Sequence, residues 1–519
     1  MSRVAVVGGG ISGIASAALL ACDGHEVTLF EKSPELGGRA GRWEAGGFRF
    51  DTGPSWYLMP EVYDHCFRLL GTTAARELDL IRLDPAYRVF FEGAKSFDIH
   101  SDRERSLALF ESVEPGAGRA LARHLDSAAR TARIAVDRFL YTDFSHLGAF
   151  LPRGDLRELP RTSLLLGRSL QSMVESAFSD RRLRQVLEYP AVFLGAAPDI
   201  APALFHLMST FDLEDGVLYP RGGFSAVIDA FVRRATAAGV ETHISTEVRR
   251  IIVEDGAVSG VEIDRAGSRT REAFDAVVSA VDSHHSDHVL LPPRARERSA
   301  RRWSKVNPGT GAVLAMLGVR GRLPGLTHHN LVFTEDWESN FGAIFGSAPY
   351  VPDPASFYAC MPSATDDSVA PVGHENLFLL VPVPADPRIG VGGVDGQGDR
   401  EVEGVVDRAI DALAAHAGAP DLAQRVVIRR TVGPADFARD LHSWRGSALG
   451  PAHTLRQSAF LRGRTRSRTT RGLFYAGATT LPGIGLPMCL ISAELVLKAF
   501  RGDRTTGPLP VFSSATAEG

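Results

Sequence analysis

The chain has 519 residues, of which 44% are hydrophobic and 23% charged, and its formal net charge is −4. This ordinary globular composition allows about two to four domains, and the charge balance argues against a nucleic-acid partner. The four cysteines are scattered without a C-x-x-C pair, which is typical of a reduced, cytoplasmic protein without structural disulfides.

The beginning of the chain predicts a strand, a glycine-rich turn and a helix. Arg3–Val7 is an apolar, β-branched run of the kind found in buried parallel strands, so we expect no signal peptide before it. Gly8, Gly10 and Gly13 follow in G-x-G-x-x-G spacing. The first glycine permits a tight turn, the second lets the backbone approach a pyrophosphate, and the third lets the helix pack closely. The helix, about Ile11 to Asp23, would offer its N-terminal N–H groups to phosphate.

A second strand, Glu26–Phe30, ends at an acidic residue, Glu31. This acid lies 18 residues after Gly13, close to the roughly 20 expected for the carboxylate that binds the ribose of an adenine dinucleotide. A carboxylate here would repel a 2′-phosphate, which argues against NADP. Because strand, turn, helix, strand and acid occur in order, we predict a bound adenine dinucleotide.

Two segments downstream distinguish NAD from FAD. Leu36-Gly37-Gly38-Arg39 is a second glycine pair, and Asp51-Thr52-Gly53-Pro54 follows it. These motifs resemble the flavoprotein family that includes amine oxidases and carotenoid desaturases. In that family the segment matched by Gly38 and Arg39 runs along the pyrophosphate, and the segment matched by Gly53 and Pro54 lies near the flavin ring. The resemblance therefore implies FAD.

Helices dominate the prediction for the next part of the chain, apart from a hairpin around Gly93. Periodic apolar positions, interrupted by prolines, predict helices between Ser101 and Ser179. Trp56, Tyr57 and Met59 belong either to the core or to the wall of a substrate pocket.

The segment from Phe150 to Leu170 mixes apolar residues with arginine. It either forms amphipathic helices folded on their own core or presents a basic, apolar face to anionic lipid. No apolar run of the chain reaches the ~20 residues that span a bilayer.

The chain then returns to the dinucleotide-binding unit. We expect a helix at Ser225–Ala238, two strands around a turn at Asp255-Gly256, and a buried strand at Phe274–Ala280. On the resemblance, Val248 fits the position whose backbone contacts the adenine.

A histidine cluster, SHHSDH, contains His284, His285 and His288. No cysteine or carboxylate pattern accompanies it, so we expect a polar loop at an exposed turn and no metal site.

The third quarter of the chain predicts a sheet. Runs between Asn307 and Pro384 are β-rich and suit one wall of a substrate cavity, and Glu401–Gly418 reads as an amphipathic helix. Here the resemblance narrows to carotenoid desaturases. The stretch SFYACMPSATDDSVAPVGHENLFLLVPVP resembles their P-S-x-x-D-x-x-x-A-P-x-G turn and V-P-V-P exit. The segment from Gly446 resembles their G-S-A and Q-S-A-x-x-R motifs.

The segment from Gly472, GLFYAGATTLPGIGLPMCLISAELV, resembles the flavin-binding end of these enzymes. We expect a buried strand, Leu473–Ala476, an irregular loop, and a helix, Cys489–Phe500, whose N-terminus would stabilise the anion of reduced flavin. Met488 replaces a glycine of the family pattern, a departure that bears on substrate length or regiochemistry. The residues expected to hold the flavin here are Gly477, Ile484, Gly485, Leu486 and Pro487.

The predicted fold class is α/β. We expect a Rossmann-like FAD-binding domain, a mixed-sheet substrate domain and a helical subdomain that could face a membrane. The expected division is an FAD-binding domain in three parts (1–95, 213–290 and 446–502), a helical substrate region (96–212), a substrate-binding domain (291–445) and a disordered tail (503–519).

The resemblance implies desaturation of a carotenoid precursor, 15-cis-phytoene, toward lycopene or a partly desaturated intermediate. Alternatives on the same scaffold are a carotenoid ketolase or oxidase and a hydroxycarotenoid desaturase. An amine oxidase is a further alternative. Such enzymes usually need an aromatic cage and often a lysine near the flavin, and Lys305 is the one lysine of this chain in a plausible substrate region. A non-catalytic prenyl-lipid carrier would lose the flavin motifs that this chain keeps.

The resemblance also implies oxygen or a quinone as electron acceptor. Because a C40 hydrocarbon is confined to bilayers, we expect a cytoplasmic protein bound peripherally to the inner face of the membrane. No acid–base set is recognisable, so we predict that the flavin alone carries the redox step and that no side chain is an indispensable base. Asp143, in the YTDF segment, is the first carboxylate to test as a base; otherwise it is a surface or capping residue.

Overall fold

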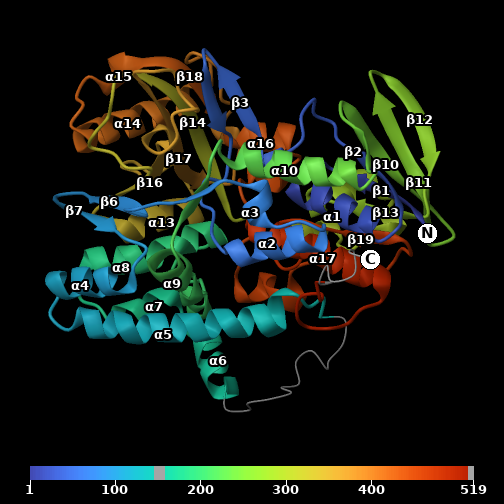
Figure 1. The fold of residues 1–519 in the computed structure, drawn as a ribbon, viewed down its shortest axis with the longest axis horizontal. Helices are drawn as coiled ribbons and strands as arrows, with labels where there is room; N and C mark the ends of the chain where they lie inside the picture. Colours follow the sequence, from blue (N-terminus) through green and yellow to red (C-terminus); the bar gives the residue numbers. More distant parts are fainter. Residues whose placement is uncertain (145–157, 512–519) are drawn as a thin grey trace, which may run out of the picture.

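The structure is a computed structural model that describes residues 1–144 and 158–511. Toward the right of Figure 1 lies a five-stranded parallel sheet whose strands come from three separate parts of the chain. The strands are β1 (Arg3–Val7), β2 (Glu26–Phe30), β9 (Glu241–His243), β13 (Ala276–Ser279) and β19 (Leu473–Tyr475). Their order across the sheet is β19-β13-β1-β2-β9.

Both faces of this parallel sheet are covered. Side chains alternate along a strand, so Val4 and Val6 pack with helices on one face, whereas Ala5 and Val7 pack with a second sheet on the other. The helices are α1 (Ile11–Cys22), α10 (Phe224–Ala237) and α17 (Leu486–Arg501). The second sheet is antiparallel and consists of β10 (Thr246–Glu254), β11 (Ala257–Arg265) and β12 (Ser268–Ala273). Burial on both faces explains the continuous apolar runs of the central strands.

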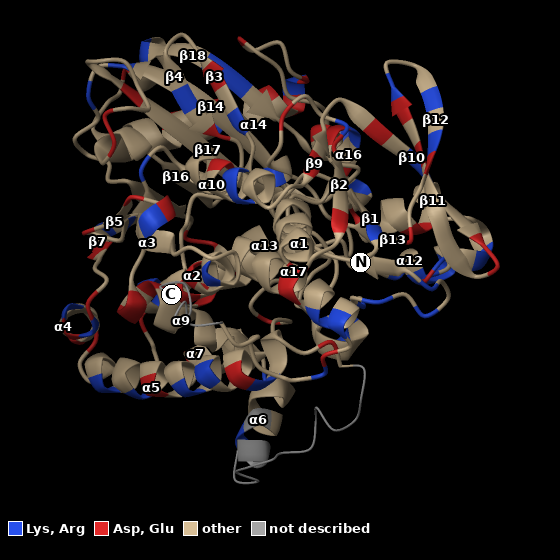
Figure 2. Ribbon diagram, turned by 45° about the vertical axis from the view of Figure 1, so that its right-hand side comes forward, with Lys and Arg blue, Asp and Glu red and all other residues tan. Residues whose placement is uncertain are grey.

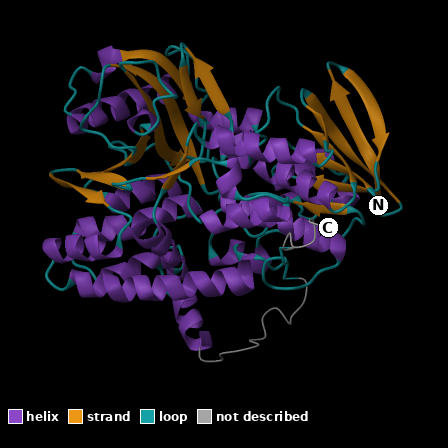
Figure 3. Cartoon of the chain, in the orientation of Figure 1, coloured by secondary structure: helices purple, strands orange, loops and turns teal. Residues whose placement is uncertain are grey.

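A seven-stranded mixed sheet forms the other large layer, at the upper left of Figure 3. Its strands are β6 (Tyr87–Phe91), β7 (Ala94–Ile99), β14 (Thr310–Arg320), β15 (His329–Phe333), β16 (Phe357–Cys360), β17 (His374–Pro384) and β18 (Val426–Val432). The order is β18-β14-β17-β16-β15-β6-β7, with a parallel pair between β15 and β6. One face packs against α14 (Arg400–Ala417), and the other shares a core with the helical region. Two short ribbons complete the sheets, β3 (Arg42–Ala45) with β4 (Phe48–Asp51) and β5 (Leu80–Arg82) with β8 (Leu218–Pro220).

The helical region lies below the seven-stranded sheet in Figure 1. Its longest helix, α5 (Ala117–Ala135), is amphipathic. Leu121, Leu125 and Ala128 are buried, and charged residues lie along its outer surface (Figure 2). The helices are α2 (Pro60–Leu69), α3 (Ala74–Glu77), α4 (Arg103–Val113), α5 (Ala117–Ala135), α6 (Glu158–Gly167), α7 (Leu170–Glu175), α8 (Arg181–Glu188) and α9 (Met208–Thr210). Shorter helices elsewhere are α11 (Ser283–His285), α12 (Ala300–Trp303), α13 (Trp337–Phe345), α15 (Leu422–Arg425) and α16 (Pro434–Asp440).

Most predicted elements are confirmed, including the strand–turn–helix at the start, the hairpin around Gly93, the β-rich third quarter and the final strand and helix. The structure adds that α17 begins at Leu486, three residues before the predicted start. The predicted segment Phe150–Leu170 lies partly outside the described residues.

Two predictions need correction. The histidine cluster is not an exposed loop: it forms α11 and one π-helical turn, and His285 and Asp287 are buried. The tail is not disordered from residue 503, because Leu509 is buried and its N–H donates to Glu494. Residues 512–519 of the predicted tail lie outside the described residues.

In the part of the chain that the structure describes, no helix is both long and apolar enough to cross a membrane.

Candidate functional site

A cavity of about 1410 Å³ runs from the glycine turn toward the helical region. Every residue predicted to hold the cofactor lines it except Gly13. Those that do are Gly8, Gly10, Glu31, Gly38, Arg39, Gly53, Pro54, Val248, Gly477, Ile484, Gly485, Leu486 and Pro487.

The three glycines of the first turn differ in what a side chain would meet at each position. Gly8 has a φ of +103°, a region that L-residues rarely adopt. A Cβ on Gly13 would lie 1.9 Å from the carbonyl oxygen of Gly8, so the helix could not pack there. A Cβ on Gly10, by contrast, would meet no protein atom within 4 Å and would project into open space. Among the described residues, no steric conflict therefore requires glycine at position 10.

Glu31 holds the glycine turn from the end of β2. Its carboxylate accepts hydrogen bonds from the N–H groups of Gly9, at 2.6 Å, and Ser33, at 2.8 Å. A carboxylate has about four acceptor positions, so capacity remains for ribose hydroxyls. The acid thus has a structural role that the sequence did not reveal, and its binding of ribose stays a prediction.

The second glycine pair packs against the first. The N–H of Gly37 donates to the carbonyl of Gly9 at 2.8 Å, and a Cβ on Gly38 would lie 3.2 Å from the Cα of Gly10. Two glycine segments therefore form one backbone surface at the N-terminus of α1, where N–H groups and the helix dipole favour phosphate.

Arg39 is held by remote parts of the chain. Its Nε donates to the carbonyl of Ala448 at 2.8 Å, and its Nη2 donates to Ser443 Oγ. Burial lowers the pKa of this guanidinium, and the nearby carboxylate of Asp282 partly offsets that effect. Arg39 is thus a fixed positive charge beside the cavity.

Asp51 of the D-T-G-P motif has a role that the sequence did not reveal. Its carboxylate accepts from the N–H groups of Phe224, at 2.7 Å, and Ser225, at 3.0 Å, at the start of α10. Burial raises the pKa of Asp51, and these donors counteract the increase. The motif therefore joins the cavity wall to a helix more than 170 residues away.

The C-terminal loop before α17 is fixed by two further residues that were not predicted. His453 Nε2 accepts from the N–H of Ile484 at 3.1 Å. Arg462 is buried and donates to the carbonyls of Ala478, at 2.8 Å, and Thr480, at 3.2 Å. Burial lowers the pKa of Arg462 to about 9. Both side chains shape the loop that contains the predicted flavin contacts.

The histidine cluster lies beside this loop: the N–H of Ser283 donates to Thr479 Oγ1, and His285 lines the cavity. His284 stacks on Trp444 with ring centroids 3.7 Å apart, and His285 stacks on His442 at 3.9 Å. The backbone N–H of His284 and that of Trp444 both donate to Asp282. These contacts explain why a polar run is packed inward.

Away from the glycine turn, the cavity wall is predominantly apolar. Trp56 and Met59 line it, whereas Tyr57 packs on Tyr63 with ring centroids 4.1 Å apart and does not. Other apolar residues of this wall are Ile134, Val136, Phe139, Leu140, Phe144, Leu166, Phe193, Leu194, Leu204, Phe205, Leu207, Met208, Phe211, Leu314, Leu380 and Phe460. Most of them come from the helical region and the seven-stranded sheet, so these two units enclose this half of the cavity.

Two other residues named from the sequence lie outside this wall. Asp143 is half-buried and does not line the cavity; it contributes to the electrostatic environment of Lys498. Lys305 is exposed and does not line the cavity either.

Comparison with known proteins shows to which family this chain belongs. The sequence profile of the family described as flavin containing amine oxidoreductase matches residues 11–496. The chain belongs to this family. Among the curated relatives, the carotenoid 3,4-desaturase of Haloarcula japonica is 40% identical over 500 residues, which cover 96% of this chain and 98% of that protein. The zeta-carotene-forming phytoene desaturase of Myxococcus xanthus is 34% identical over 497 residues, covering 95% and 93% of the two chains.

Solved structures show the same fold at lower identity. An oxidoreductase from Methanosarcina mazei aligns with a TM-score of 0.62 at 17% identity, covering 96% of this chain and all of that one. Putrescine oxidase bound to putrescine aligns with a TM-score of 0.60 at 15% identity, covering 96% and 99%.

The chain is thus a flavin-dependent oxidoreductase, and its cofactor is FAD. The residues present fit this group. The open space beside Gly10 accommodates the close approach of a pyrophosphate, and the cavity continues from there to Gly53, Pro54 and the loop before α17. When bound, FAD supplies a two-electron acceptor for hydride.

Proposed function

We propose that this protein is an FAD-dependent carotenoid desaturase. The observation that carries the proposal is the continuity of one cavity, in which the glycine turn and the long apolar wall share about 1410 Å³. Ligand pockets are typically about 300–1,000 Å³, so this cavity has room for more than one ordinary ligand. An adenine dinucleotide and a long hydrocarbon suit its two halves. The names of the two most similar relatives described above support the same substrate class.

The proposed cofactor contacts are the thirteen predicted residues that line the cavity. Gly13 would act indirectly, by letting α1 approach the turn. We assign the cofactor to a domain formed by 1–95, 213–290 and 446–502, because these segments supply the strands of the parallel sheet. Residues 96–212 and 291–445 then supply most of the substrate wall.

The test is product analysis of the purified, FAD-loaded protein with carotenoids in liposomes. Phytoene should yield products that lack pairs of hydrogens and absorb at longer wavelength. A hydroxycarotenoid assayed in parallel tests the alternative named from the sequence, a hydroxycarotenoid desaturase on the same scaffold. Oxidation of amines but of no carotenoid would contradict both assignments.

We also propose that the protein works at a membrane surface. Apolar side chains are exposed at positions that include Leu166 of α6 and Phe460, and both of these also line the cavity. Leu164 is 69% exposed on the same helix, which extends below α5 in Figure 1. A bilayer that covers these side chains would give a hydrocarbon a direct way into the cavity.

Liposome flotation tests this surface. Replacing Leu164 and Phe460 by serine should lower the fraction of protein that floats with anionic liposomes, because buried apolar area drives interfacial binding. Val372 is fully exposed in a turn elsewhere, so Val372→Ser is the matched control. Equal flotation of all variants would contradict this surface.

A further inference from the structure

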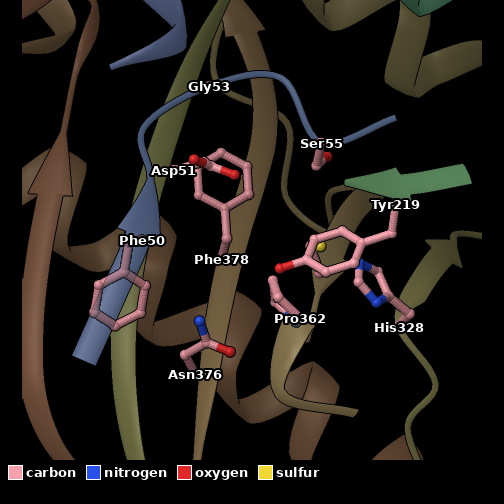
Figure 4. A pocket seen from close by; sticks show the side chains of 10 residues that line it. Phe50, Asp51, Gly53, Ser55, Tyr219, His328, Pro362, Asn376 and Phe378 are labelled. Carbon is pink, nitrogen blue, oxygen red and sulfur yellow. The ribbon is translucent and has the colours of Figure 1, made fainter. Parts of the chain in front are cut away.

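A second, smaller cavity of about 20 Å³ is shown in Figure 4, and Gly53 and Ser55 line both it and the main cavity. Its lining includes Ser55, Tyr219, His328 and Cys360. In Figure 4 the ring of Tyr219 lies against that of His328, and their centroids are 4.5 Å apart. A cavity of this size has room for one water molecule.

Two adjacent histidines, of which His328 lines this cavity, are buried and incompletely paired. His328 is 4% exposed and His329 is not exposed at all. Among the residues that the structure describes, neither Nε2 has a hydrogen-bond partner. Burial lowers the pKa of His328 to about 3 and that of His329 well below its usual value. Both imidazoles are therefore neutral at rest, and burial makes each of them a weak base that would hold a proton only briefly.

One phenol connects this pair to the main cavity. Tyr358 lines the main cavity, and its hydroxyl lies 2.6 Å from His329 Nδ1 and 2.7 Å from Ser55 Oγ. Trp56, which also lines the main cavity, stacks on His329 with centroids 4.6 Å apart and planes 10° apart. The neutral imidazole is thus one hydrogen bond away from the substrate space.

Desaturation requires a proton acceptor as well as a hydride acceptor. Forming one double bond removes a hydride from one carbon and a proton from its neighbour. The charged residues that line the main cavity come mainly from segments around the glycine turn, including Glu31, Glu35, Asp282, Asp436 and Asp440. Asp143 does not line the cavity. Tyr358 is a titratable group within the predominantly apolar wall, which also contains Thr131, Arg161 and Ser163.

We propose that Tyr358 and His329 form a relay that accepts the proton released in desaturation, an inference that rests on the proposed function. The C–H bond breaks, its electron pair forms the double bond, and its proton binds Tyr358 Oη. The hydroxyl proton of Tyr358 moves at the same time to Nδ1 of His329. The hydride from the neighbouring carbon would go to FAD, the two-electron acceptor that the glycine turn would hold. Tyr358 is the group that touches substrate, and His329 acts through it.

Burial and the neighbouring His328 both disfavour a positive charge on His329, so its protonated state would be short-lived. The stacked face of Trp56 attracts a cation, an interaction that strengthens in desolvated sites. Asp366, whose charge raises the pKa of neighbouring His328, adds a nearby negative charge. The 20 Å³ cavity beside His328 offers a place to which the proton can move next.

The test is anaerobic single-turnover reduction of FAD by a liposomal carotenoid. General base catalysis typically contributes 10²–10⁴-fold, so Tyr358→Phe and His329→Gln should each slow the reduction about 10²-fold. The substrate concentration for half-saturation and the bound FAD should stay unchanged. Since the two residues act as a unit, the double variant should be no slower than the slower single variant. Tyr63→Phe, which removes a buried hydroxyl that does not line the cavity, is the matched control.

Three outcomes would overturn the relay while leaving the proposed function intact. They are unchanged rates in the single variants, losses that multiply in the double variant, and a stoichiometric metal ion in the wild-type protein. The last matters because His328, His329 and Cys360 place one ligand atom each within 4.8 Å of one another. A metal on Nε2 would keep the proton on Nδ1, and His329 could not accept one from Tyr358. Absence of desaturation in the wild type would instead contradict the proposed function.

Discussion

Replacement of Gly10 by alanine separates cofactor binding from folding. The backbone at Gly10 has φ −72° and ψ 170°, a conformation that alanine adopts freely. The added Cβ would meet no protein atom within 4 Å. The free energy of unfolding of the apoprotein should therefore lie within about 0.5 kcal/mol of the wild-type value, or slightly above it, because alanine lowers the entropy of the unfolded chain.

The affinity for FAD should fall in the same variant. An added methyl group in a closely packed contact typically costs about 1–3 kcal/mol, which corresponds to about 5- to 150-fold weaker binding. Flavin fluorescence titration of the apoprotein measures this loss, and urea unfolding measures the stability. Gly13→Ala is the counterpart: its Cβ would lie 1.9 Å from the Gly8 carbonyl, so it should destabilise the apoprotein itself. Unchanged FAD affinity in Gly10→Ala would refute the assignment of the open space to the pyrophosphate.

Three further predictions concern carboxylates. Glu31→Arg should lower the flavin-to-protein ratio after purification, because it removes the acceptor of the Gly9 N–H and adds a buried charge; an unchanged ratio would count against the ribose assignment. Asp51→Ala should lower the free energy of unfolding, measured with urea, by about 0.5–2 kcal/mol, because it removes the carboxylate that caps α10. An unchanged free energy of unfolding would show that these contacts contribute little. Burial raises the pKa of Asp212 to about 7, above the unfolded value of about 4. Its contribution to folding stability is therefore fully present below about pH 4 and is lost as the pH rises toward 7. Relative to Asp212→Asn, wild type should lose stability between about pH 4 and pH 7, and a constant difference would contradict the shift.

The placement of the first predicted site residues around one turn depends on short-range geometry. Gly8, Gly10 and Gly13 have their roles because of a turn of six residues, and Glu31 is placed by the next strand. Local spacing is sufficient for such a unit, since a strand, a tight turn and a helix N-terminus determine one another.

The residues that the sequence did not reveal act across long separations. Asp51 caps a helix that begins at Phe224, and Arg462 holds carbonyls of a loop 16 residues or more away. Tyr358 meets Ser55 across 303 residues. No periodicity or motif spacing encodes these pairs, because each depends on how the sheets and helices pack.

Composition misled the prediction at the histidine cluster and at the tail. SHHSDH is polar, but Trp444 stacks on His284 and Trp303 donates to Asp287 at 2.9 Å, so remote aromatic residues cover it. The first part of the tail is held because Lys498 donates to the carbonyls of Thr505 and Gly507. In both places tertiary contacts compensate the burial of polar groups.

The central claim is that one cavity brings a long hydrocarbon to FAD, and anaerobic reduction of the bound FAD tests it most directly. We expect liposomal phytoene or a hydroxycarotenoid to bleach the flavin absorbance, with one new double bond formed for each FAD reduced. Putrescine and other amines should leave the flavin oxidised. Reduction by amines, or an oxidised flavin in the presence of every carotenoid offered, would contradict the account.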